Sequence, residues 1–245
     1  MTPEDLVAAA CPKIATMGSA YYFVPETKAI AEGLGLDSFR FYFLGRGGVL
    51  GDVEAPVVAS AFGYFKPELV AKMWDTAKAV VAPREAGRAF HLACAGLGGR
   101  LIAEVDGLFA FCAAAEAVNA AADPAGLPLY AGIRCEPRVE DLPGRAMQLI
   151  TVLRELRGGA HLLAVRAVGL DAKTAHWISR PGDIAMFGWS EDEAPTITDA
   201  DRAAMVEAEA LTDRLVTPAY AVLDDTQQQA IRTGLDRIEA ALAAA

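Results

Sequence analysis

Apolar residues recur at intervals of three and four along most of this chain, which is the period of an amphipathic helix. Evidence for strands is thin, and only residues 37–46, with four aromatic side chains, fit a strand as well as a buried helix. The pattern therefore predicts an all-α, multi-helix protein. Four prolines between residues 124 and 143 separate an aromatic-rich first half, residues 1–125, from a second half, residues 126–245. We expect the two halves to pack as one globular unit.

The clearest helical signals lie between residues 149 and 180. Residues 149–157 carry an apolar stripe, and Gly158-Gly159 predicts the end of that helix, because glycine readily adopts the left-handed conformation of a helix terminus. Further helices are expected over 160–169 and 171–179, where Asp171 is a good N-cap. Two short helices joined at a glycine are typical of a helix-turn-helix. In that register the inward positions are all apolar: Ala164, Val168, Leu170, Ala175 and Ile178.

Charge and composition narrow the classes of partner. The chain has 245 residues, of which 53% are hydrophobic, so it can bury a large core. Its net charge is −10, whereas phosphate binding needs clustered basic residues, so we expect no nucleic-acid partner. No apolar run is long enough to span a membrane, and the acidic start Glu4-Asp5 is unlike a signal peptide. We therefore expect a soluble, cytoplasmic protein without a membrane partner. One local basic group stands against the acidic background: Arg154, Arg157, Arg166, Lys173 and Arg180.

Cysteines and histidines give little sign of a metal or a cofactor. The four cysteines form no Cys-x-x-Cys pair and fit buried, reduced thiols. The three histidines lack the spacing of a metal site, so we expect no metal. A single histidine would suffice as the axial ligand of a haem, so haem stays open while the cofactor is otherwise unknown. We find no dinucleotide fingerprint and no nucleophile elbow.

An ordered set of residues along most of the chain resembles an uncharacterised actinobacterial family described as helix-turn-helix-like. The matching residues are Tyr42-Phe43, Arg46, Gly51, Val57-Val58, Ala61-Phe62, Phe65, Pro67, Val70, Trp74, Leu153-Arg154-Glu155, Arg157-Gly158, His161, Gly169-Leu170, Glu209, Thr212-Asp213 and Pro218. The resemblance implies a helical protein with a degenerate winged-helix-like second half, and it brings no activity. The chain departs from the family at Gly159, where an aspartate is usual, and the segment 189–198 is short for a full wing.

His161 and Asp213 are the candidates for catalytic chemistry. We place His161 at a helix start, where free backbone N–H groups disfavour the imidazolium, so a neutral ring could act as a general base or a ligand. We place Asp213 near a helix C-terminus, where a carboxylate is electrostatically unfavourable. A contact with His161, Arg154 or Arg157 would compensate it. Both residues could equally be structural, and we expect His91 and His176 to be surface residues or satisfied core residues.

Arginines and aromatic residues are the candidates for ligand binding. Arg154 and Arg157 suit recognition of a carboxylate or phosphate, because the planar guanidinium gives two parallel hydrogen bonds. Glu155 could instead pair with either of them in an ordinary salt bridge. Arg46 follows an aromatic run, and aromatic side chains could form a pocket around its charge or belong to the plain core. The aromatic candidates are Tyr42, Phe43 and Phe62.

Three functions fit these residues. The first is a small-molecule-binding protein of regulator-like helical architecture, whose ligand is apolar with an anionic group. The second is an enzyme in which His161 is the general base and an arginine orients the substrate. The third is a transcription regulator that binds DNA through residues 160–179, for which a homodimer would be usual. Burial of Lys173 and His176 would argue against the third, whereas a cavity beside His161 would favour the first two.

Overall fold

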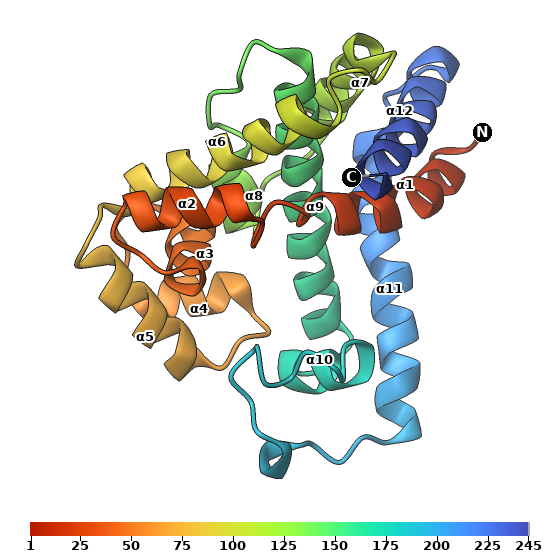
Figure 1. The fold of residues 1–245 in the computed structure, drawn as a ribbon. Coiled ribbons are helices and arrows are strands. Elements are labelled where there is room, and N and C mark those ends of the chain that lie inside the picture. Colours follow the sequence, from red (N-terminus) through yellow and green to blue (C-terminus); the bar gives the residue numbers. More distant parts are fainter. Residues whose placement is uncertain (245) are drawn as a thin grey trace.

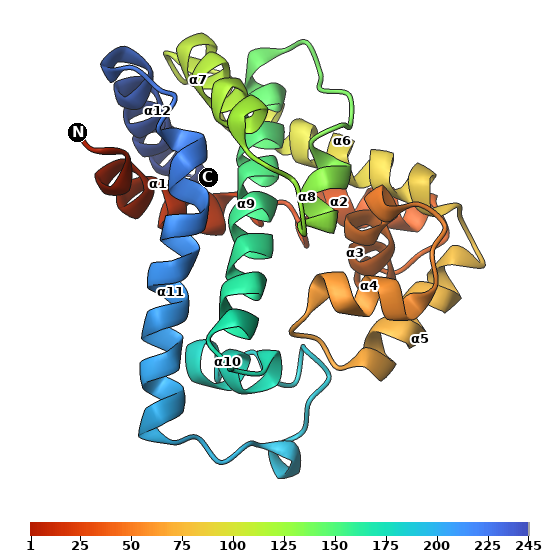
Figure 2. The ribbon, with the colours of Figure 1, turned by 180° about the vertical axis from the view of Figure 1, so that it is seen from behind.

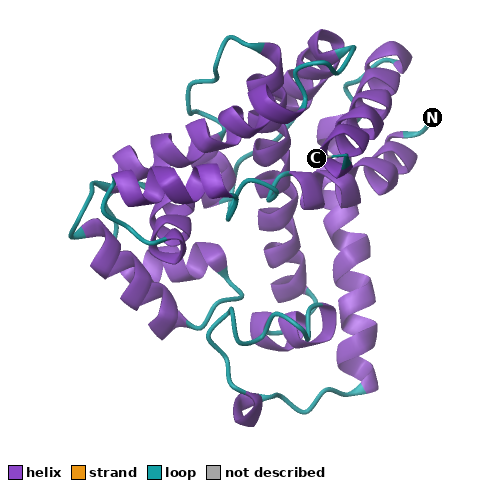
Figure 3. Ribbon diagram, viewed as in Figure 1, coloured by secondary structure: helices purple, strands orange, loops and turns teal. Residues whose placement is uncertain are grey.

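The computed structural model describes residues 1–244, which form twelve α-helices and two short 3-10 helices, with no strand among those residues (Figures 1 and 3). The predicted all-α class is confirmed, and the aromatic run after Asp37 is a helix. The elements are α1 (Pro3–Met17), α2 (Pro25–Gly33), α3 (Ser38–Gly47), η1 (Gly48–Leu50), α4 (Ala55–Phe62), α5 (Pro67–Lys78), α6 (Pro83–Leu101), α7 (Leu108–Ala121), α8 (Pro128–Ile133), α9 (Leu142–Ala167), α10 (Ala172–Ser179), η2 (Glu191–Glu193), α11 (Asp199–Tyr220) and α12 (Asp225–Ala243).

Helix α9 is the central element of the fold, and α1, α6, α7, α8 and α11 all pack against it (Figure 1). Its residues 146–153 are buried without interruption, so this part of the helix has no solvent face. The two polar members are satisfied: the Gln148 side chain bonds to backbone groups of Val139 and His91, and the Thr151 hydroxyl donates to the Met147 carbonyl. The arginines and the histidine of the candidate site follow on the next two turns.

The predicted helix end at Gly158-Gly159 is wrong, because α9 continues through both glycines to Ala167. A glycine inside a helix costs only about 1 kcal/mol relative to alanine. The flanking Leu156 and Ala160 are buried, so packing of the apolar face outweighs that cost. Prolines are passed in the same way: α1 continues through Pro12 to the buried Met17, and α11 continues through Pro218 to the buried Tyr220.

The predicted turn between the second and third helices of the motif is confirmed. Gly169 has a φ of 83°, which favours glycine, and the Asp171 side chain accepts a hydrogen bond from the Thr174 N–H to cap α10. Helix α10 packs against both α9 and α11 and lies across their lower ends in Figure 1. The small core between these helices contains the predicted inward positions: Ala164, Leu170 and Ala175 are buried, and Val168 and Ile178 are partly buried.

Elements from both halves of the sequence pack on one another. Helix α1 packs against α11 and α12, as the two opposite views show (Figures 1 and 2), and α6 and α7 of the first half pack against α9 of the second. Cys11, Cys94 and Cys112 are buried free thiols as expected, whereas Cys135 is exposed. None of the described helices is long and apolar enough to cross a membrane.

Candidate functional site

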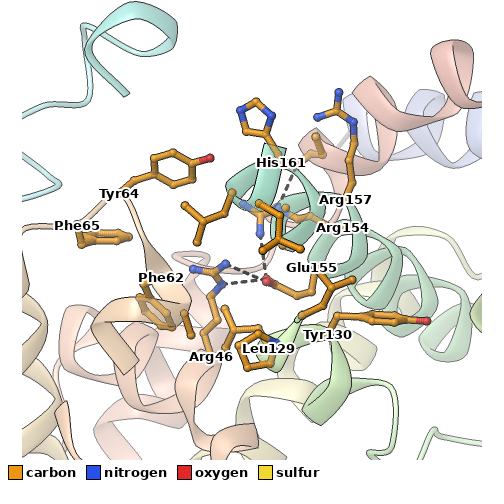
Figure 4. A pocket seen from close by; sticks show the side chains of 18 of the residues that line it. Arg46, Phe62, Tyr64, Phe65, Leu129, Tyr130, Arg154, Glu155, Arg157 and His161 are labelled. Carbon is orange, nitrogen blue, oxygen red and sulfur yellow. Dashed lines mark hydrogen bonds and ion pairs between the residues drawn. The ribbon is translucent and has the colours of Figure 1, made fainter. Parts of the chain in front are cut away.

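A cavity of about 490 Å³ lies where α9 meets the aromatic first half, and α8, α10 and α11 also contribute to its walls. Six of the predicted site residues line it, which are Tyr42, Arg46, Phe62, Arg154, Arg157 and His161. All of these except Tyr42 are labelled in Figure 4. The remaining two lie outside: the Phe43 ring stacks behind Phe62 at 5.5 Å, and Asp213 lies on α11 with 42% of its side chain exposed. Residues more than a hundred positions apart in the chain thus meet at one hollow.

The inner part of the cavity holds a buried cluster of two arginines and one glutamate. Arg46 donates from Nε and Nη2 to the two oxygens of Glu155, each at 2.9 Å, and Arg154 donates from Nη1 to the same carboxylate at 3.1 Å (Figure 4). The side chains of Arg46, Glu155 and Arg154 are 15%, 4% and 20% exposed. Burial alone would raise the pKa of the Glu155 carboxyl, but the two guanidinium groups outweigh it and hold that pKa below its usual value.

Aromatic rings surround both guanidinium groups of this cluster. The Arg46 guanidinium lies 4.6 Å from the centroid of the Phe62 ring and also donates to the Tyr42 hydroxyl at 3.2 Å. Arg154 lies 5.3 Å from the centroid of the Tyr22 ring and donates from Nε to the Ala15 carbonyl. These neighbours are neutral, so two positive charges are balanced by the single carboxylate of Glu155. The cluster therefore carries a net charge of about +1 on side chains that are at most 20% exposed.

The outer part of the cavity contains His161, one to two turns further along α9. The Nδ1 atom of His161 is 2.9 Å from the Thr212 hydroxyl, and its Nε2 is 3.8 Å from a Glu209 oxygen. Arg157 donates from Nη2 to Glu209 at 2.8 Å and to Asp213 at 3.3 Å. Burial lowers the pKa of the His161 imidazole below its usual value, although Glu209 favours the charged form. A neutral imidazole therefore faces the cavity beside a hydroxyl and a carboxylate.

The structure places both His161 and Asp213 inside helices rather than at helix ends. His161 lies inside α9 rather than at a helix start, so burial rather than free backbone N–H groups keeps its ring neutral. Asp213 lies within α11 rather than at its end, so the helix terminus places no demand on it. The predicted contact of Asp213 with Arg157 is nevertheless present, because α9 and α11 pack side by side. Glu155 pairs with Arg154, as one alternative expected, and with the unforeseen Arg46.

Three buried polar atoms of cavity-lining residues have no hydrogen-bond partner within residues 1–244: the Tyr64 hydroxyl, Arg157 Nε and His176 Nε2. Tyr64 is not among the residues predicted for the site, and the sequence predicted His176 to be a surface residue or a satisfied core residue. Burial raises the pKa of the Tyr64 hydroxyl well above its usual value and lowers that of His176 to about 4. His91 does not line the cavity; its two ring nitrogens are buried without a partner in the described part of the chain, and burial lowers its pKa to about 4.

Comparison with known proteins identifies the family. The model of a helix-turn-helix family matches residues 8–186, which is more than half of the chain. The chain belongs to this helix-turn-helix family. No curated protein and no solved structure matches it. Membership indicates a regulator-like helical protein, and it does not fit the expectation, drawn from net charge, that nucleic acid is no partner.

The helix-turn-helix segment itself presents few free basic side chains. The Lys173 ammonium lies between two rings, 5.4 Å from the centroid of Trp177 and 4.7 Å from that of Trp189, and His176 is buried. The basic group seen in the sequence is divided, since Arg154 and Arg157 line the cavity while Arg166 and Arg180 are exposed at its edge. Within the described residues, no group of three or more histidine, cysteine or acidic side chains could hold a metal ion.

Proposed function

We propose that this helix-turn-helix protein binds a small organic anion with an apolar body in the cavity between its aromatic half and α9. The single observation that carries the proposal is the excess positive charge of the Arg46–Glu155–Arg154 cluster. Removing an ion from water costs several kcal/mol even after the surroundings relax, and a charge without a counter-charge does not recover that cost. An anionic group beside Arg154 would supply the missing counter-charge.

The rest of the cavity supports an apolar body on the ligand. Phe62, Phe65 and Leu129 are buried side chains of the wall next to the arginines. The volume of about 490 Å³ lies within the usual range of roughly 300–1,000 Å³ for small-molecule sites. The chain as a whole is acidic, with a net charge of −10, yet five arginines and only two glutamates line this cavity. The local charge therefore favours an anion against the general repulsion of the surface.

Isothermal titration calorimetry with paired probes tests this proposal. The probes are 2-naphthoate and decanoate, each beside its neutral carboxamide. We expect the acids to bind at least about tenfold more tightly than the amides, and Arg154→Met to remove that preference. Arg138→Met is the matched control, since Arg138 is also a largely buried arginine, paired with Glu116, but does not line the cavity. Equal binding of acids and amides, or unchanged binding by Arg154→Met, would contradict the proposal.

DNA binding through residues 160–179 is a second candidate function, which the family favours. The exposed basic side chains on or next to this segment are Arg166 and Arg180, whereas Lys173 lies between the rings of Trp177 and Trp189. Fluorescence anisotropy with a labelled duplex of mixed sequence, at several salt concentrations, tests it. If this segment binds DNA, the logarithm of the association constant should fall linearly with the logarithm of the salt concentration. Arg166→Ala should reduce the magnitude of that slope by about one, whereas the control Arg202→Ala on α11 should leave the slope unchanged. A complete lack of binding at low salt would remove this candidate.

A further inference from the structure

The inner part of the cavity contains the buried arginine–glutamate cluster, whereas the outer part contains buried polar atoms without partners. These atoms indicate which chemical group the far end of a ligand carries. The Tyr64 hydroxyl, Arg157 Nε and His176 Nε2 are buried and have no hydrogen-bond partner in the described chain. Buried polar groups in proteins are almost always paired, so unpaired ones that share a cavity indicate an absent partner. The Tyr64 hydroxyl in Figure 4 is directed toward the side of the cavity where His161 lies.

No buried charge around these atoms is left unpaired. Arg157 is paired with Glu209 and Asp213, and the two further arginines of this wall, Arg166 and Arg180, are exposed to solvent. The two histidine rings are kept neutral by burial. The outer part therefore does not require a second anion. The Tyr64 hydroxyl can donate a hydrogen bond, so an oxygen acceptor on the ligand would satisfy it.

On the basis of the proposed function, we infer that the ligand is a monocarboxylic acid that carries a neutral oxygen function, a hydroxyl or a carbonyl, at its opposite end. The carboxylate lies beside Arg154 and Arg46, and the oxygen function lies beside Tyr64, whose ring centroid is 6.3 Å from that of His161. Glu155 and His161 are six residues apart on one helix, which corresponds to about 9 Å along the axis. A rigid bicyclic or phenylpropenoic acid spans such a distance, and the rings of Phe62 and Phe65 flank it.

Matched pairs of acids that differ by one hydroxyl group test this inference by calorimetry. The pairs are 2-naphthoate with 6-hydroxy-2-naphthoate, and cinnamate with 4-hydroxycinnamate; naphthalene-2,6-dicarboxylate serves as a dianion of similar length. We expect the hydroxylated member of at least one pair to bind about tenfold more tightly, because it alone satisfies buried groups that otherwise stay unpaired. The dicarboxylate should bind more weakly than either hydroxy acid.

Two variants that each remove one hydroxyl oxygen test whether the preference for hydroxylated acids depends on Tyr64. Tyr64→Phe removes a hydroxyl that makes no hydrogen bond in the described protein, so the variant should fold normally and reduce the tenfold preference to about threefold or less. Tyr130→Phe is the control in the same cavity, because its hydroxyl is already bonded to Asn119, and it should leave the preference unchanged.

The outcomes separate the inference from the proposed function. Carboxylates that bind through Arg154 with equal affinity within every pair, or a dicarboxylate that binds most tightly, would overturn the inference and leave the proposed function standing. A preference that survives Tyr64→Phe would also overturn it. If no carboxylate binds, or if Arg154→Met leaves the affinity for the carboxylates unchanged, both the proposed function and the inference are wrong.

Discussion

Glu155 is the residue on which the stability of the inner cluster depends, and its replacement gives the sharpest test of the charge argument. Glu155→Gln keeps the size of the side chain but removes the one carboxylate that, among residues 1–244, pairs with Arg46 and Arg154. Two guanidinium groups would then stay buried without a counter-ion. Breaking a buried ion pair in this way costs about 3–5 kcal/mol. For a protein of this size that corresponds to a fall in Tm of about 6–20 °C.

Arg154→Met provides the comparison, because it removes one positive charge and leaves a neutral pair. Arg46 keeps both of its hydrogen bonds to Glu155, so the carboxylate stays satisfied on both oxygens. The variant loses one charge-assisted hydrogen bond of about 1.5–3 kcal/mol and the contact with the Tyr22 ring. It also avoids a desolvation cost of several kcal/mol. We therefore expect the free energy of unfolding to change by less than about 1 kcal/mol.

Urea unfolding followed by circular dichroism and by tryptophan fluorescence measures both variants. The order of stability should be wild type close to Arg154→Met, and both well above Glu155→Gln. A Glu155→Gln protein as stable as the wild type would show that the cluster is hydrated and that no excess charge is buried. An Arg154→Met protein as unstable as Glu155→Gln would show that Arg154 is needed for packing, and the charge argument for a ligand would lose its basis.

Three further predictions concern other parts of the fold. The free energy of unfolding should fall as the pH decreases from 6.5 to about 4. Burial and Arg138 lower the pKa of His91 to about 4, so in this range the unfolded chain binds a proton that the folded chain does not. In urea titrations at several pH values, His91→Leu should reduce this dependence of stability on pH. Gly98→Ala should destabilise the protein strongly, because the added Cβ would lie 2.3 Å from the Pro143 carbonyl oxygen. The Cβ of Gly99→Ala meets nothing within 4 Å, so this variant should raise the free energy of unfolding by up to about 1 kcal/mol. Gly158→Ala, also without a neighbour within 4 Å, should stabilise α9 by about 0.5–1 kcal/mol as measured by urea titration, and a loss would contradict the uninterrupted helix.

The sequence predicted what depends on local signals and missed what depends on tertiary packing. The turn at Gly169 and the cap at Asp171 were predictable because one residue type fulfils each backbone requirement. The continuation of α9 through two glycines was not, because burial of the surrounding apolar face decides it. The pairing of Arg46 with Glu155 links positions 109 residues apart and leaves no trace in local spacing. Tyr64 was missed because a single tyrosine in a loop carries no pattern.

The two proposed functions share structural elements and are therefore not independent. Helix α9 carries Arg154, Arg157 and His161 of the cavity, and its residues 160–167 form the first helix of the helix-turn-helix. Helix α10 contributes His176, whose ring lies 4.0 Å from the Phe187 ring, which in turn stacks at 4.0 Å on Phe65. A ligand between Phe65 and α9 would contact the same stack of rings that holds α10 in place. If both functions are present, linkage requires the ligand to change DNA affinity by the same factor by which DNA changes ligand affinity. If the ligand binds without changing DNA affinity, the stack of Phe65, Phe187 and His176 is arranged in the same way with and without the ligand. Helix α10 would then have only a structural role with respect to the ligand.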